Sequence, residues 1–214
     1  EGALYVYRGS ASGVVTPPTI IQGDAEFLGL GRSVAPAGDV NGDGYADVLA
    51  GCIPLGSAPY DDEVRLYLGG AGGLQATPAW SRSVGDPASS GGWSMGPAGD
   101  VNGDGFADVL LSDGTHDGDV EDQGLLQLFL GHHDGLATEA SWSTLGPEDP
   151  DDGHDRPVTA GDVDGDGFSD IIVGAPAHDL DRGRLRCFHG GPQGVREQAG
   201  WVPEPNQAGA AYGA

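Results

Sequence analysis

The sequence has very little positive charge, little sulfur and no long apolar run. Its 214 residues include nine Arg and no Lys against 33 acidic residues, which gives a formal net charge of −24. Such a chain repels phosphate backbones and anionic lipid headgroups, so nucleic-acid binding is excluded and adsorption to an anionic membrane is not expected. No stretch reaches the roughly 18 apolar residues of a membrane-spanning helix, so we expect no membrane insertion. The two cysteines, Cys52 and Cys187, are too few for a disulfide scaffold.

Glycine, by contrast, is abundant and recurs at a fixed period. Gly (40) and Pro (15) form about a quarter of the chain, a composition that would indicate disorder if it were aperiodic. Two motifs repeat instead, one of the type GDVNGDGYADVL and one of the type LYLGGAGGL. Their first glycines are Gly38, Gly99 and Gly161 for the former, and Gly9, Gly69, Gly131 and Gly190 for the latter. Two motifs that share a period of about 60 residues establish an internal repeat.

Each repeat predicts short β-strands. The apolar stretches 46–52, 64–69, 125–131 and 169–175 are rich in Val, Ile, Leu and aromatic residues, and Gly, Pro, Asp and Asn separate them. No window shows the apolar stripe of an amphipathic helix. Four short strands per repeat are typical of a β-propeller blade, which must stack on neighbouring blades to bury its faces. We therefore predict an all-β protein, a β-propeller built from four-stranded blades.

The period divides the chain into about three and a half blades. We expect a half blade over 1–25, complete blades over 26–86, 87–147 and 148–206, and the start of a further blade over 207–214. An open arc of blades exposes strand edges and two blade faces. Either a second copy of the chain closes the ring as a homodimer, or the chain is a segment of a longer propeller.

An acidic loop in each complete blade has oxygen-bearing side chains at alternating positions. The spacing D-x-[DN]-x-D-G-x-x-D directs these oxygens at one point, and the main-chain carbonyl at the seventh position completes the predicted shell. The predicted metal ligands are Asp39, Asn41, Asp43, Tyr45 and Asp47 in the first loop, Asp100, Asn102, Asp104, Phe106 and Asp108 in the second, and Asp162, Asp164, Asp166, Phe168 and Asp170 in the third. Oxygen ligands favour Ca²⁺, whereas Zn²⁺ prefers His or Cys. The expected cofactor is Ca²⁺, at three sites.

The alternative reading of these loops is an acidic turn without a metal. Carboxylates crowded within a few ångströms repel one another strongly, which favours a bound cation. The loops do not form EF-hands, because position 12 holds Ala50, Leu111 or Val173 in place of the bidentate Glu. We therefore expect a structural ion that fixes a hairpin loop in each blade, with the modest affinity of extracellular modules.

The two motifs together resemble the FG-GAP repeat of integrin α-subunit propellers and their bacterial relatives. The GAP element is literal at 174–176 and has drifted at 51–54 and 112–114, while the FG element appears as Leu30-Gly31 and Tyr212-Gly213. The resemblance implies a seven-bladed ring with Ca²⁺ between the two inner strands of a blade and ligands on the opposite face or the rim. It also implies a non-enzymatic module for extracellular recognition or adhesion, secreted or at the cell surface, with a protein or glycan ligand.

A propeller domain of an extracellular enzyme acting on polysaccharides or lipids is the alternative function, and a self-assembling half-propeller is a third. His116 and His178, each beside aspartates, follow the GAP position and are the histidines that an acid–base pair would use. Ser94 lies in a G-x-S-x-G match at 92–96, but a metal loop follows it where a nucleophile elbow requires a helix. We expect Ser94 to be an ordinary strand serine, and we predict no catalytic residue.

Aromatic and histidine residues complete the set of candidates. Tryptophans occur at corresponding repeat positions, namely Trp80, Trp142 and Trp201. Their repetition predicts packing between blades, with glycan stacking as the secondary interpretation. Trp93 lies outside this register and is the better candidate for a specific contact. His132 and His133 lie in the turn of the second motif, where we expect a solvated turn and a transition-metal site is the alternative.

Overall fold

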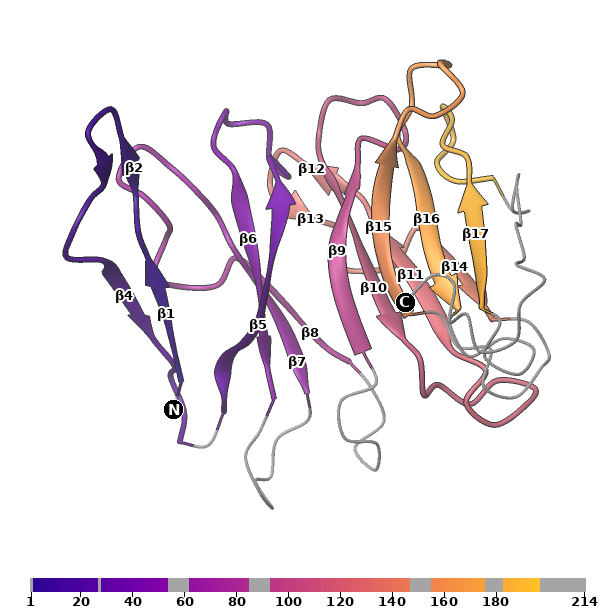
Figure 1. The fold of residues 1–214 in the computed structure, drawn as a ribbon, viewed down its shortest axis with the longest axis horizontal. Helices are drawn as coiled ribbons and strands as arrows, with labels where there is room; N and C mark the ends of the chain where they lie inside the picture. The colour runs from indigo at the N-terminus through magenta and orange to yellow at the C-terminus, as the bar shows by residue number, and fades with distance from the viewer. Residues whose placement is uncertain are drawn as a thin grey trace.

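The computed structural model of the protein describes residues 2–26, 28–53, 62–84, 93–146, 155–175 and 183–196. Every regular element within these ranges is a β-strand. Figure 1 shows the strands grouped into small antiparallel sheets that stand side by side, from the indigo N-terminal sheet to the yellow C-terminal one. The prediction of an all-β propeller architecture is therefore confirmed.

Two sheets have four strands each, paired in an order that follows the chain. The first sheet contains β5 (Leu30–Gly38), β6 (Asp47–Cys52), β7 (Glu63–Tyr67) and β8 (Trp80–Ser83). The second contains β9 (Trp93–Gly99), β10 (Asp108–Asp113), β11 (Leu125–Phe129) and β14 (Trp142–Leu145). Each strand pairs with its predecessor in these sheets, which is the meander of a propeller blade.

The remaining sheets are smaller. The described part of the third blade contains β15 (Asp155–Gly161), β16 (Asp170–Ala175) and β17 (Arg184–Phe188). At the other end, β1 (Ala3–Val6) pairs with β4 (Thr19–Gln22) as a two-stranded sheet. The second motif forms short hairpins, β2 (Gly9–Ser10) with β3 (Gly13–Val14), and β12 (Gly131–His132) with β13 (Gly135–Leu136).

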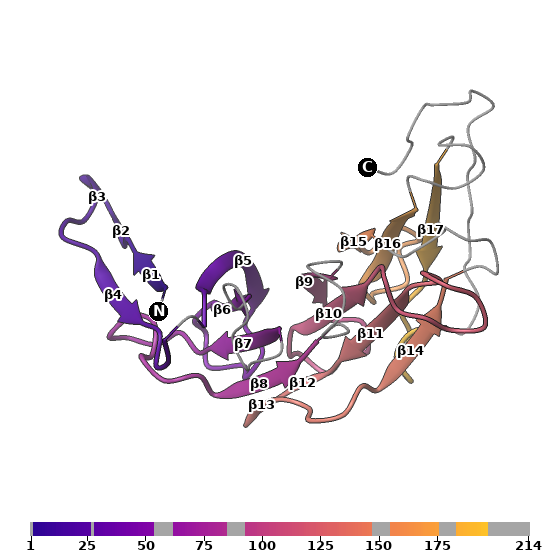
Figure 2. The same cartoon turned by 90° about the horizontal axis from the view of Figure 1, so that it is seen from below.

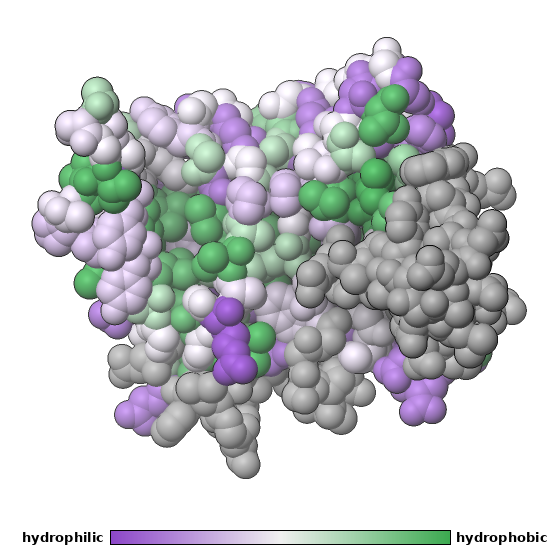
Figure 3. All heavy atoms as spheres, viewed as in Figure 1, coloured by the Kyte–Doolittle hydropathy of each residue, from purple (hydrophilic) through white to green (hydrophobic). Residues whose placement is uncertain are grey.

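The sheets form an open arc. In Figure 2, β5, β9 and β15 lie on the concave side and β8 and β14 lie on the convex side. Figure 3 looks onto the concave side and shows apolar residues among the polar ones. Val34 on β5 and Val158 on β15 are 62% and 46% exposed. Strands β5 and β15 therefore present part of their apolar surface toward the axis of the arc.

The apolar core lies between the blades. The second strands, β6, β10 and β16, are buried along almost their whole length. For β6 and β10 the cause is a neighbouring sheet on each face. One core cluster joins Leu49 and Leu66 of the first blade to Val109 and Leu111 of the second. A second cluster joins Leu110 and its neighbours to β16 and β17 of the third blade. Stacking therefore supplies the burial that a single blade lacks.

The repeated tryptophans lie at these interfaces, which confirms the predicted packing between blades. Trp80 makes an edge-to-face contact with Phe129 of the next blade, with ring centroids 5.3 Å apart. Trp142 makes the same contact with Phe188 at 5.1 Å. Trp201 lies outside the described residues. Aromatic pairs in this geometry add stabilisation beyond the area that they bury.

Other sequence candidates take ordinary structural positions. Trp93, the tryptophan outside the register, is half-buried and donates its indole N–H to Asp62 Oδ2 of the preceding blade at 2.7 Å. Cys52 and Cys187 are buried free thiols, so no disulfide joins them. Ser94 pairs with Ser112 inside the β9–β10 ladder, and no helix follows β9, as expected for a strand serine.

Candidate metal centres

The three acidic loops occupy the same position in their blades. Each connects the first strand of a blade to the second, over 39–47, 100–108 and 162–170. All three lie at the same end of the strands, along the upper edge in Figure 1. The sequence repeat therefore becomes a row of equivalent loops on one face of the arc.

The first aspartate of each loop organises a sharp turn. In the second loop, Asp100 Oδ1 accepts hydrogen bonds from the N–H groups of Gly103 at 2.7 Å and Asp104 at 3.1 Å. Its Oδ2 accepts from Gly105 at 2.9 Å. Gly105 has φ +90°, a left-handed conformation that residues with a Cβ resist. Asp162 accepts all three equivalent bonds in the third loop, and Asp39 accepts two of them in the first loop, from Asp43 and Gly44.

This turn brings the oxygen side chains at the first, third and fifth positions together. Asp100 Oδ1 and Asn102 Oδ1 both lie 3.1 Å from the amide nitrogen of Asp104. In the third loop, Asp162, Asp164 and Asp166 offer carboxylate oxygens that all lie within 4.8 Å of one another. The seventh-position residues, Tyr45, Phe106 and Phe168, donate their amide N–H to the fifth-position carboxylate at 2.9 to 3.1 Å.

The ninth-position aspartates are buried and join the two sequence motifs. Asp108 is fully buried, its Oδ2 accepts from Val101 N–H and its Oδ1 accepts from Gly131 N–H, both at 2.9 Å. Asp47 and Asp170 make the same pair of bonds in their own blades. The acidic loop is therefore tied to the first glycine of the second motif.

Steric crowding explains why that residue is glycine. A Cβ at Gly131 would overlap the carbonyl oxygen of Ala107 and would lie 2.7 Å from the carbonyl oxygen of Val40, in the preceding blade. Gly190 has the same relation to Ser169 and Val101. The repeated glycine marks the point where a hairpin approaches the acidic loops of two successive blades.

The loops are also linked to one another. The backbone N–H of Ala107 donates to Asp39 O of the preceding loop at 2.9 Å, and the N–H of Ser169 donates to Asp100 O at 2.9 Å. The Phe106 ring packs over Gly42, where a Cβ would lie 2.9 Å from the ring. A change in one loop therefore acts directly on the interface with the next blade.

The electrostatics of the first two loops fit a bound cation. The pKa of Asp108 is raised to about 7, chiefly by burial and to a smaller extent by the nearby charges of Asp104 and Asp100, although the N–H bonds from Gly131 and Val101 lower it. Burial also raises the pKa of Asp47. Among the described residues, no basic side chain forms an ion pair with either loop. Clustered hard oxygen donors without a counter-charge suit Ca²⁺.

Among the described residues, the third loop has basic neighbours that the other two loops lack. Arg196 forms an ion pair with Asp166 at 3.0 Å, and His189 Nδ1 lies 3.3 Å from a carboxylate oxygen of both Asp164 and Asp170. Sequence reasoning did not single out His189. The sequence feature that could have pointed to His189 is its position directly before Gly190, whose N–H donates to the ninth-position aspartate, Asp170.

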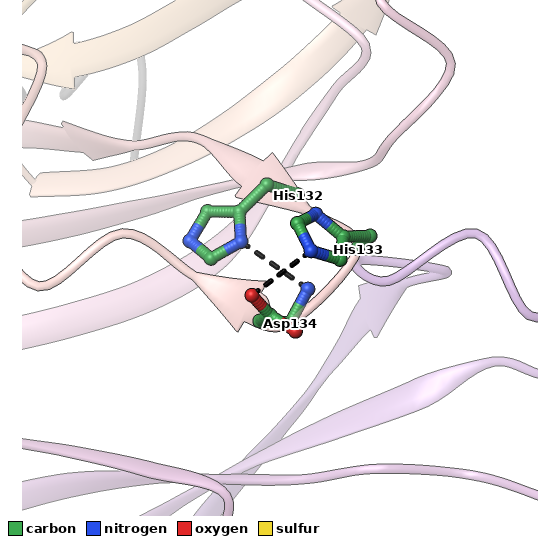
Figure 4. A group of neighbouring side chains, drawn as sticks. All are labelled: His132, His133 and Asp134. Carbon is green, nitrogen blue, oxygen red and sulfur yellow. Dashed lines mark hydrogen bonds and ion pairs between the residues drawn. The ribbon is translucent and has the colours of Figure 1, made fainter.

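A second group of donor atoms lies on the β12–β13 hairpin. Figure 4 shows His132, His133 and Asp134 turned toward one another, with donor atoms within 4.8 Å. His132 Nδ1 accepts the Asp134 N–H at 3.3 Å, and His133 Nε2 lies 3.0 Å from Asp134 Oδ2. The side chains of His133 and Asp134 are largely exposed, so the turn is solvated as expected.

A cavity of about 380 Å³ lies where the first two full blades meet, at the opposite end of the strands from the acidic loops. His116, Asp113 and Asp117 line it, together with Arg82 from β8. The loop itself engages both carboxylates, because Asp113 Oδ1 accepts from Thr115 and Asp117 Oδ1 accepts from a backbone N–H. His116, Asp113 and Asp117, the residues that the enzyme hypothesis would use as an acid–base pair, therefore lie together at this cavity. His178 lies outside the described residues.

Stacked four-stranded sheets with acidic loops between their inner strands define a segment of a β-propeller. The model of the FG-GAP-like repeat matches residues 39–111 and 100–173, and the model of the FG-GAP repeat matches 158–194. The chain therefore belongs to the FG-GAP repeat family, and the sequence-based identification is confirmed.

Similar proteins are integrin α subunits. The chain is 31% identical to rat integrin alpha-7 over 185 residues, which cover 83% of this chain and 15% of the relative. It is 32% identical to Xenopus laevis integrin alpha-5 over 172 residues (78% and 16%) and 32% identical to mouse integrin alpha-IIb over 154 residues (68% and 15%). The chain thus spans about 15% of the length of these relatives. Among the described residues, no helix has the length and apolarity needed to cross a bilayer.

Proposed function

We propose that this chain is an integrin-like propeller module that binds three Ca²⁺ ions and recognises a protein or glycan outside the cell. The calcium proposal rests on the buried ninth-position carboxylate, as at Asp108, which lies near the carboxylates of Asp100 and Asp104. No basic side chain in the part of the chain that the structure describes pairs with these three groups. The similarity to integrin α subunits supports recognition and adhesion as the function. The same similarity supports a non-enzymatic role and an extracellular or cell-surface location.

Each ion would be held by side chains at positions one, three, five and nine and by the seventh-position carbonyl. In the second loop these are Asp100, Asn102, Asp104, Phe106 and Asp108. The bound ion would supply the positive charge that these oxygens lack. Three ions would also lower the magnitude of the formal net charge from −24 to −18, by two charges each.

The structural consequence of the ion extends beyond its own loop. Asp108 binds Gly131 N–H, and the carbonyl of Asp100 binds Ser169 N–H of the next blade. An ion that fixes the second loop would therefore fix both the hairpin of its own blade and the contact to the third blade. We propose that the ions hold the row of blades in register and take part in no chemistry.

A surface at the opposite end of the strands is the proposed recognition surface. Binding residues commonly lie on the loops that connect rigid elements. The acidic loops are tied into the blade interfaces, which favours the other end of the strands for recognition. Closure of the ring by a second copy of the chain stays a prediction, because neither the described strands nor the comparisons bear on it. The cavity beside His116 keeps an enzyme as the second candidate function.

Thermal unfolding with and without calcium tests the proposal. A ligand that binds only the folded state stabilises it by RT ln(1 + [L]/Kd), which is about 0.4 to 1.4 kcal/mol per site for roughly 1 mM Ca²⁺ and the Kd of extracellular modules, about 10⁻⁴ to 10⁻³ M. We expect the melting temperature of the metal-free chain to rise with added Ca²⁺ and to fall again with chelator. Glu139→Gln, an exposed change outside the loops, should retain the full response. An identical melt in Ca²⁺ and in chelator would contradict the proposal.

Binding to immobilised extracellular-matrix proteins and to a glycan array tests the recognition function. We expect at least one protein or glycan to be retained in Ca²⁺ and released by chelator. Hydrolysis of an arrayed polysaccharide, lost on His116→Ala, would favour the enzyme instead.

A further inference from the structure

The third acidic loop differs from the other two at two positions, and these two positions meet in space. The third position of the loop is Asp164, where the other loops have asparagine. The residue before the repeated glycine is His189, where the other two blades have Leu68 and Leu130. His189 Nδ1 lies 3.3 Å from Asp164 Oδ2. The two departures from the repeat therefore form one local arrangement.

The arrangement also includes the buried ninth-position aspartate. His189 Nδ1 lies 3.3 Å from Asp170 Oδ1, and the three donor atoms lie within 4.8 Å of one another. This nitrogen is buried and makes no hydrogen bond, although two carboxylate oxygens are close to it. The His189 side chain is 19% exposed and that of Asp170 is fully buried. The His189 Nδ1 atom therefore lies near both carboxylate oxygens, but its geometry is not that of a hydrogen bond to either of them.

These separations fit the coordination sphere of zinc. Zn²⁺ binds His nitrogen and carboxylate oxygen at about 2.0 to 2.2 Å, and two tetrahedral ligands at that distance lie roughly 3.4 Å apart. Both N···O separations are 3.3 Å, and the two carboxylate oxygens lie within 4.8 Å of each other. Imidazole is a preferred ligand of zinc, whereas Ca²⁺ takes oxygen ligands. At the same place the other two blades present a leucine side chain, which has no donor atom.

We propose that the third loop, which can also hold Ca²⁺, prefers Zn²⁺ because His189, Asp164 and Asp170 act as its ligands, while the first two loops prefer Ca²⁺. This inference rests on the proposed function in one respect only, that the acidic loops fold around a divalent ion. Three protein ligands leave a fourth position for water or for a further loop oxygen. The third blade would then carry a different ion from its neighbours and hold it at lower free-metal concentration.

His132 and His133 could bind Zn²⁺ at a separate place, so both imidazoles are replaced before Zn²⁺ binding is measured. The double change His132→Ser and His133→Ala restores the residues of the first hairpin, Ser10 and Ala11. His133 is exposed and His132 is partly exposed in this hairpin, and the first hairpin folds with Ser and Ala at these positions, so the fold should be unaffected. This variant serves as the parent for all zinc measurements.

Metal counting by equilibrium dialysis tests the inference directly. The metal-free parent is dialysed against millimolar Ca²⁺ with increasing Zn²⁺, and both metals are counted per chain. We expect one Zn²⁺ to replace one of three Ca²⁺ ions. His189→Leu, which installs the residue of the other blades, should weaken Zn²⁺ binding by at least about tenfold and still bind three Ca²⁺. Asp164→Asn, the matched change on the loop, should also weaken Zn²⁺ binding.

Cobalt substitution adds a spectroscopic readout. Co²⁺ in the parent should give the intense visible absorption of a tetrahedral site, and His189→Leu should abolish it. Equal Zn²⁺ affinity of the parent and His189→Leu would overturn the inference. So would three Ca²⁺ ions that Zn²⁺ does not displace, in which case His189 is not a metal ligand and the calcium proposal stands. Zn²⁺ bound through His189 in a chain that binds no Ca²⁺ would support the inference and refute the proposed function.

Discussion

Replacement of Asp108 should destabilise the metal-free protein strongly, because its carboxylate satisfies two buried donors. Asp108→Ala leaves the N–H groups of Val101 and Gly131 without the acceptor that they have at 2.9 Å. An unsatisfied buried donor costs about 1 to 3 kcal/mol, so the loss of two predicts about 2 to 6 kcal/mol. Asp108→Asn keeps one acceptor oxygen and turns an N–H₂ group toward the other donor, which predicts about half of that loss.

The assay is urea unfolding followed by tryptophan fluorescence, in excess chelator at pH 8. Chelator separates the hydrogen-bond effect from the loss of a metal ligand. The pKa of Asp108 is raised to about 7, and pH 8 is chosen because it lies above this value, so that the carboxyl group is ionised. Asp104→Ala is the matched control, since Asp104 is a predicted ligand of the same loop but is exposed. Its free energy of unfolding in chelator should change by less than about 1 kcal/mol. Equal stability of Asp108→Ala and the wild type in chelator would refute the reasoning.

Three further predictions concern the blade interfaces. Gly131→Ala should lower the free energy of unfolding by about 1 to 3 kcal/mol in the same urea assay, because its Cβ overlaps backbone, whereas Gly72→Ala, which has open space around it, should be neutral. Trp80→Phe should cost about 1 kcal/mol in a thermal melt, because it loses the indole N–H bond to Ala137 O at 3.0 Å; an unchanged melt would show that the bond contributes nothing. Burial raises the pKa of the Cys52 thiol to about 12, so its alkylation at pH 8 should be very slow in the native protein and fast in urea, and rapid native labelling would contradict its burial.

The repeat made most of the fold predictable from the sequence. The fixed period located the strands, and the turn glycines located the acidic loops, because both depend on local backbone requirements that a sequence displays directly. The repeated tryptophans also predicted packing between blades, which the contact of Trp80 with Phe129 confirms. These features are local or recur, so a single chain contains several copies of the same signal.

Contacts between distant residues were not predictable in the same way. The bond from Asp108 to Gly131 joins the two motifs across 23 residues, and spacing alone does not show which glycine N–H meets which carboxylate. His189 was overlooked because it replaces an apolar residue and lies outside the loop motif. Only the fold places its ring beside Asp164 and Asp170. The blade boundaries and the complete ligand sets remain predictions.

The number of calcium ions bound per chain tests the central claim most directly. The chain is stripped of all metals and titrated with Ca²⁺ by isothermal calorimetry, with the stoichiometry checked by equilibrium dialysis. We predict three ions per wild-type chain and two for Asp100→Asn, which alters the leading ligand of the second loop. A chain that stays folded and binds no Ca²⁺ at millimolar concentration would contradict the claim that the acidic loops are calcium sites.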